Sequence, residues 1–148
     1  MGDKEPGRES TVRTAIDANI FSSIWSKEPA AGEVAERLGM AQQEGALLIS
    51  PFAFAELHAH PNAKPGFVHT FLEATGVVID YKMQEQVWSE AGQRFARYAA
   101  RRRKAIGEGP RRLLADFLIG AHALVQAERL LTLDPKVYRQ DFPELRLL

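Results

Sequence analysis

The 148-residue sequence contains no cysteine. This absence excludes disulfide bonds and thiolate metal sites, and it suits a reducing cytoplasm. No apolar run approaches the roughly 20 residues that a membrane-spanning helix requires. The polar N-terminal segment also lacks the hydrophobic stretch of a signal peptide. We therefore expect a cytoplasmic protein with no membrane association.

A net charge is also lacking, because 19 basic residues balance 19 acidic ones. The overall charge therefore predicts no affinity for nucleic acid. The segment from Arg94 to Arg112, however, holds many Lys and Arg residues against the single acid Glu108. It is either the solvated face of a long helix or a clamp for a phosphate backbone, since Lys and Arg that neutralise phosphates give affinity independent of base sequence. The candidate RNA-binding residues are Arg101, Arg102, Arg103, Arg111 and Arg112.

Hydrophobic residues make up 45% of the sequence and charged residues 26%, as in an ordinary globular protein. The length is that of one domain with a substantial core. We expect residues 1–11 to form a flexible tail and residues 12–148 to form a single domain.

Short apolar runs alternate with amphipathic segments along the chain. The expected strands are 12–17, 46–50, 77–81, 129–134 and 145–148, and the expected helices are 19–25, 30–45, 50–60, 66–75, 84–104 and 114–128. Alternating strands and helices favour an α/β fold in which helices cover both faces of a short, mainly parallel sheet.

Several local signals refine these elements. Asn19 and Ser50 are expected to cap helices, and Pro51 fits the first helical position. Met40 is expected to face inward. Gly120 lies among small residues, so its helix is expected to approach the sheet closely.

Four carboxylates lie at the edges of apolar segments: Asp17, Glu56, Asp116 and Asp134. Charged groups beside buried strands and helices are unfavourable unless a positive group compensates them. Two of them end predicted strands and two lie near the starts of predicted helices, so they could converge at the carboxyl edge of the sheet. The simplest compensation would be a hard divalent cation such as Mg²⁺, which prefers oxygen ligands. Each acid alone is more typical of a turn, a helix cap or a solvated surface, and only their combination predicts a metal site.

These residues lie in the segments "AIDANIF", "SPFAFAEL", "LADFLIGAHAL" and "LLTLDPKVYRQDFPEL". In this order the segments resemble the PIN domain, and in particular the VapC-type toxin endoribonucleases of toxin–antitoxin pairs. The resemblance extends from Arg13 to Leu148. It implies a three-layer α/β/α sandwich, an endoribonuclease that depends on Mg²⁺ or Mn²⁺, a cognate antitoxin as partner, and homodimerisation.

The resemblance also implies roles for individual residues. Asp17 and Asp116 would be the central metal ligands, while Glu56 and Asp134 would hold a second ion or orient and deprotonate a water. Thr132 matches a hydroxyl residue often found two positions before the last acid, where it could hydrogen-bond a carboxylate.

Two alternatives stay open. The first is a catalytically silent PIN-like module that binds RNA or protein. The second is a phosphatase on a doubly wound sheet, but the Asp-x-Asp of the haloacid-dehalogenase type is replaced here by Asp17, Ala18 and Asn19.

Overall fold

The computed structural model describes residues 11–105 and 111–148. Five short strands of this part of the chain form one sheet: β1 (Thr14–Ile16), β2 (Leu47–Ile49), β3 (Val77–Ile79), β4 (Arg129–Leu131) and β5 (Arg146–Leu147). Their spatial order is β3-β2-β1-β4-β5, and each neighbouring pair is parallel. The predicted parallel sheet is therefore confirmed.

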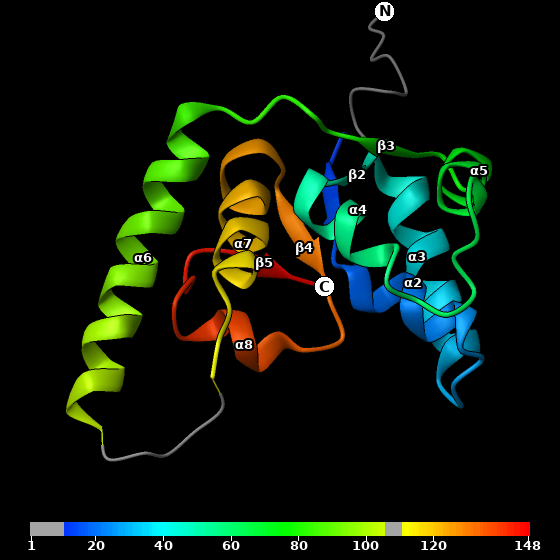
Figure 1. The fold of residues 1–148 in the computed structure, drawn as a ribbon. Coiled ribbons are helices and arrows are strands. Elements are labelled where there is room, and N and C mark those ends of the chain that lie inside the picture. The colour runs from blue at the N-terminus through cyan, green and yellow to red at the C-terminus, as the bar shows by residue number, and fades with distance from the viewer. Residues whose placement is uncertain (1–10, 106–110) are drawn as a thin grey trace, which may run out of the picture.

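Helices connect the strands: α2 (Ala18–Trp25), α3 (Ala31–Glu44), α4 (Pro51–Leu57), α5 (Phe67–Ala74), α6 (Glu85–Lys104), α7 (Leu114–Gln126) and α8 (Pro135–Arg139). Figure 1 shows α6 and α7 on one side of the strands and α3 and α5 on the other. The predicted three-layer α/β/α sandwich is confirmed. Among the helices that the structure describes, none combines the length and apolar character that a bilayer span requires.

The core lies where the central strands β1 and β4 meet α7. All residues of β1 and β4 are buried, as is the stretch of α7 from Phe117 to Ala123. This burial explains why the strands read as continuous apolar runs rather than as alternating patterns.

The predicted cap of α4 is present. Ser50 Oγ accepts a hydrogen bond from Ala53 N (3.1 Å), and Pro51 is the first helical residue. The predicted cap of α2 is wrong, because Asp17 is the N-cap residue. The Asn19 amide instead contacts Thr132 and the residue after it, so its side chain joins α2 to the end of β4.

Two further expectations need correction, and a third needs refinement. Met40 is 63% exposed, and the next residue, Ala41, is buried in its place. Gly120 itself lies against an aromatic ring, because a methyl group there would lie 2.6 Å from Phe142 Cε2, although its helix does lie close to β1 and β4 as predicted. The short helix α8 has no counterpart among the predicted elements, since its five residues carry too little periodicity. The expected N-terminal tail (residues 1–11) lies outside the described residues except for Thr11, as does the expected end of α6 at residues 107–110.

Candidate active site

The order of the strands creates a switch point between β1 and β4. From β1 the chain adds β2 and β3 on one side, and it later adds β4 and β5 on the other. Ligands of parallel sheets bind outside the carboxyl ends of strands at such a point. Asp17 directly follows β1 and Thr132 directly follows β4, so both residues lie at this position.

Asp17 is a buried carboxylate, with 7% of its surface exposed. Its Oδ2 accepts hydrogen bonds from Thr132 Oγ1 (2.8 Å) and from the Tyr138 hydroxyl (2.8 Å). No Lys, Arg or His of the described chain lies within ion-pair distance of it. Burial raises the pKa of the Asp17 carboxyl, and the negative charge of Asp116 adds to that effect. Asp17 is thus a buried acid that hydrogen bonds stabilise but that no cationic side chain of residues 11–105 and 111–148 neutralises.

Thr132 connects Asp17 to the predicted fourth acid. Besides donating to Asp17, its Oγ1 accepts from Asp134 N (3.0 Å) and from Asn19 Nδ2 (3.4 Å). The predicted contact of Thr132 with a carboxylate is therefore present. Asp134 begins α8, and its side chain is exposed. The backbone of Asp134 is held beside Asp17 while its carboxylate stays open to solvent.

Asp116 lies in the first turn of α7. Its Oδ2 accepts a hydrogen bond from Leu113 N (3.1 Å), as the acid of a capping box does. The interpretation of this residue as a helix cap is therefore confirmed. Asp116 also acts electrostatically on Asp17. It therefore combines a local role in the helix with a position beside a second acid.

Glu56 lies near the end of α4 and is exposed. Partial loss of surrounding water raises the pKa of its carboxyl, and the charges of Asp17 and Asp116 raise it further. The three acids therefore share one negative field. We refer to Asp17, Glu56, Asp116 and Asp134 as the acid cluster.

The acid cluster fits a hard cation by the chemistry of its donors, which are carboxylate oxygens, and its buried member Asp17 has no cationic side chain of the described residues within ion-pair distance. Within residues 11–105 and 111–148, no three His, Cys, Asp or Glu side chains stand at the spacing of a formed metal site. The fold thus gathers the acids without bringing them to ligand spacing. Their assignment as ligands remains a prediction.

A groove of about 730 Å³ opens beside the acid cluster, and we call it the substrate groove. Two members of the acid cluster, Asp116 and Asp134, line this groove. The other residues that line it are Tyr98, Arg101, Arg102, Ala105, Arg111, Arg112, Lys136, Val137, Gln140 and Asp141. Four of the five predicted RNA-binding arginines therefore share one groove with two of the acids.

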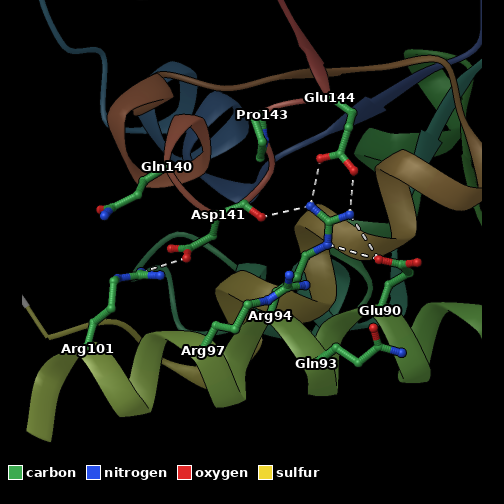
Figure 2. A pocket seen from close by; sticks show the side chains of 9 residues that line it. All are labelled: Glu90, Gln93, Arg94, Arg97, Arg101, Gln140, Asp141, Pro143 and Glu144. Carbon is green, nitrogen blue, oxygen red and sulfur yellow. Dashed lines mark hydrogen bonds and ion pairs between the residues drawn. The ribbon is translucent and has the colours of Figure 1, made fainter.

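The remaining arginines of the basic segment, Arg94, Arg97 and Arg103, do not line this groove. Arg103 is exposed and does not line the groove, which agrees with the solvated-face interpretation for that residue. Arg94 is buried, and its guanidinium donates to Glu90, to Glu144 and to the Asp141 carbonyl oxygen. Figure 2 shows this network at a second cavity of about 390 Å³, which contains none of the acid cluster. The basic segment thus contains a residue that holds the fold, a residue that is exposed to solvent and residues that line the substrate groove.

Sequence reasoning missed three residues of this site. Tyr138 donates to Asp17 from 121 residues away, and Asn19 and Asp141 hold other site residues. No local pattern pairs Tyr138 with Asp17, because α8 is too short to be recognised. The pair depends entirely on the arrangement of β1 beside β4.

Comparison with known proteins gives the family. The chain matches the family model of the PIN domain over residues 14–143. Two similar solved structures are VapBC2 from Rickettsia felis bound to a DNA fragment from its promoter (18% identity, TM-score 0.65, covering 93% of this chain and 98% of that chain) and VapBC-1 from nontypeable Haemophilus influenzae (22% identity, TM-score 0.66, covering 93% and 97%). No curated protein matches the chain. The family match spans most of the sequence and includes the whole acid cluster, and the chain therefore belongs to the PIN domain family, whose members are generally nucleases.

Proposed function

We propose that this protein is a metal-dependent endoribonuclease and the toxin of a type II toxin–antitoxin pair. The observation that carries the proposal is the buried Asp17 at the switch point of the sheet, which has no cationic side chain of the described residues within ion-pair distance and interacts electrostatically with Asp116 and Glu56. Membership of the PIN domain family, whose members are generally nucleases, also supports the proposal.

The acid cluster would hold the cation, Mg²⁺ or Mn²⁺, with Asp17 and Asp116 as the central ligands. Such an ion, when bound, supplies Lewis acidity for the attacking water and for the phosphate. Thr132 and Tyr138 keep the Asp17 carboxylate in one orientation through their hydrogen bonds to Oδ2. The pKa of the Tyr138 hydroxyl is raised, mainly by burial and then by the charge of Asp17, so this hydroxyl stays a donor at physiological pH.

The substrate groove supports a polyanionic substrate. The basic residues that line it, together with the acids Asp116 and Asp134, are Arg101, Arg102, Arg111, Arg112 and Lys136. Basic side chains draw a phosphate backbone into the groove, and the acid cluster receives the bond to be cut. RNA is the substrate that we propose.

Fold similarity to the two VapBC structures supports a partner protein. We propose a cognate antitoxin that covers the substrate groove, together with a homodimer of this chain. A cytoplasmic location is part of the proposal, because the RNA substrate is found there. Co-expression with the product of an adjacent short gene, followed by sizing of the purified material, tests both associations.

A catalytically silent PIN-like module that binds RNA or protein is the second candidate. The presence of all four acids weighs against it, because a binding role alone does not require a buried, uncompensated carboxylate such as Asp17.

The deciding experiment is digestion of single-stranded RNA with Mg²⁺, with Mn²⁺ or with chelator. We expect cleavage only with metal, and loss of cleavage by a folded Asp116→Asn variant. Asp80→Asn is the matched control. Asp80 also follows a strand, but that strand is β3 at the edge of the sheet, separated from β1 by β2, and its carboxylate bonds His122 and Gln126 of α7. Binding of RNA without cleavage under either metal would favour the silent module instead.

A further inference from the structure

One buried carboxylate of the substrate groove holds two arginines from different parts of the chain. Asp141 Oδ1 accepts from Arg101 Nη2 (2.6 Å), and Asp141 Oδ2 accepts from Arg112 Nη1 (2.6 Å). The Asp141 side chain is 2% exposed, so solvent does not compete for these bonds. The single negative charge of Asp141 therefore holds two guanidinium groups in place. Together, Asp141, Arg101 and Arg112 carry a net positive charge in the groove.

Part of the Arg112 guanidinium has no hydrogen-bond partner among the described residues. Its Nη1 is bonded to Asp141, but its buried Nε and Nη2 atoms have no hydrogen-bond partner in the described chain. Arg112 also forms an ion pair with Asp116, but the distance from Nε to Asp116 Oδ2 is 4.0 Å, which is beyond hydrogen-bond length. Buried donors without partners are unfavourable and uncommon in folded proteins, so this pair of N–H groups calls for a ligand.

Arg94 shows what a purely structural arginine looks like in the same region. Its Nε, Nη1 and Nη2 atoms all donate to protein oxygens, as Figure 2 shows. Arg112 is just as buried, with 10% of its side chain exposed against 8% for Arg94. Burial and ion pairing alone therefore do not explain why Arg112 keeps two donors unused.

The position of Arg112 indicates the ligand. It lines the substrate groove together with Asp116 and Asp134, and its guanidinium is 4.6 Å from the centre of the Phe117 ring, which fixes its plane. An arginine whose fork is held in one plane matches two oxygens of a phosphate. Nε and Nη2 are adjacent donors of that fork, and Nε lies on the side of Asp116.

We propose that Arg112 binds the phosphate that undergoes cleavage through Nε and Nη2, and that Asp141 is the positioning residue that aims it. The inference rests on the proposed nuclease function. Arg101, whose side chain is 41% exposed, is the second member of the pair and contacts a neighbouring phosphate. Arg112 is then a catalytic residue, since it stabilises charge that develops on the phosphate oxygens.

The test compares four variants in Mg²⁺-dependent cleavage of single-stranded RNA, each at a temperature where circular dichroism shows it folded. Arg112→Met keeps the side-chain volume against Phe117 and should lower kcat by about 10²–10³-fold. Arg112→Lys should recover only a small part, because an ammonium lacks the planar fork. Asp141→Asn should lower kcat by about 10-fold, and the control Arg94→Met should lower thermal stability while kcat stays within 3-fold of wild type.

A second readout is independent of cleavage. Binding of fluorescent single-stranded RNA in chelator, measured over a series of salt concentrations, should lose about 0.7 from the slope of log K against log salt in Arg112→Met. An unchanged kcat in that variant, with active wild type, overturns the inference and leaves the nuclease proposal standing. If wild type cleaves nothing with either metal, the nuclease proposal fails. The salt slope then decides whether Arg112 binds phosphate, and an unchanged slope or a complete lack of RNA binding overturns that too.

Discussion

Thr132 donates its hydroxyl hydrogen to Asp17 Oδ2 over 2.8 Å, although 115 residues separate the two in sequence. The contact follows from strand pairing. Ile16 is in register with Leu131, so the residues that follow β1 and β4 emerge side by side. Two unremarkable strand ends become one polar site because the sheet places them at its switch point.

Thr132→Val should reduce RNA cleavage by about 10-fold or more. The change removes the donor to Asp17, and it leaves Asp134 N without its acceptor. Loss of a residue that orients a metal ligand typically costs this much. Thr132→Ser keeps the hydroxyl and should stay within about 3-fold of wild type. Equal activity of the Val and Ser variants in steady-state assays would contradict this role.

Asp17→Asn should stabilise the metal-free protein at pH 7. Burial raises the pKa of the Asp17 carboxyl above its ordinary value in the folded state, so ionisation disfavours folding. Wild type is then most stable at a pH below the unfolded value and loses stability as pH rises through the interval up to the folded value. The variant lacks this loss, so its free energy of unfolding and its Tm at pH 7 should both exceed those of wild type.

Urea unfolding in chelator at pH 7 and at pH 3 measures this effect. The advantage of Asp17→Asn should vanish at pH 3, where the wild-type carboxyl is protonated in both states. Added Mg²⁺ should stabilise wild type and not the variant, since a ligand of the folded state adds to its stability. A variant that is less stable than wild type in chelator at pH 7 would argue against an uncompensated charge at residue 17.

Gly120→Ala should destabilise the fold by about 1–3 kcal/mol. The added methyl group would meet the ring of Phe142, which is fully buried and has no room to move. Phe142→Leu in the same chain should recover part of the loss, because contacting residues are not additive. The control is Gly92→Ala in α6, where nothing lies within 4 Å, and helix propensity alone should raise stability by up to about 1 kcal/mol. Thermal unfolding that ranks Gly120→Ala with Gly92→Ala would contradict the packing of Phe142.

His122 should make stability fall as the pH drops through 6.5. The ring is fully buried, and Nε2 lies 2.9 Å from Asp80 Oδ2. Burial lowers the pKa of His122 below that of an ordinary imidazole, against the opposing effect of Asp80. A base with a lowered folded-state pKa favours its neutral form, so stability is present above the unfolded pKa and is lost below it. His122→Gln should flatten the dependence of unfolding free energy on pH between about 7 and 5, whereas an unchanged slope would show that other groups carry it.

Local patterns in the sequence were sufficient for the fold class and for most elements. Buried parallel strands read as short apolar runs, and Ser50 with Pro51 marks a helix start, because both signals depend on neighbouring residues alone. The acids were recognisable for the same reason, since Asp17 and Asp134 each follow an apolar run. Met40 was misplaced because a helical period leaves the edge of the buried face undecided by about one residue.

The tertiary structure alone decided what these residues contact. Tyr138 and Thr132 meet on Asp17, and Arg101 and Arg112 meet on Asp141, across separations of 29 to 121 residues. The sequence does not distinguish Arg94, whose guanidinium nitrogens all donate hydrogen bonds, from Arg112, whose Nε and Nη2 have no partner in the described chain. The difference lies in which oxygen atoms the fold places near each guanidinium. Periodicity and capping involve residues within one or two helical turns, so the sequence alone predicts them. Hydrogen bonds between distant side chains depend on how distant segments pack.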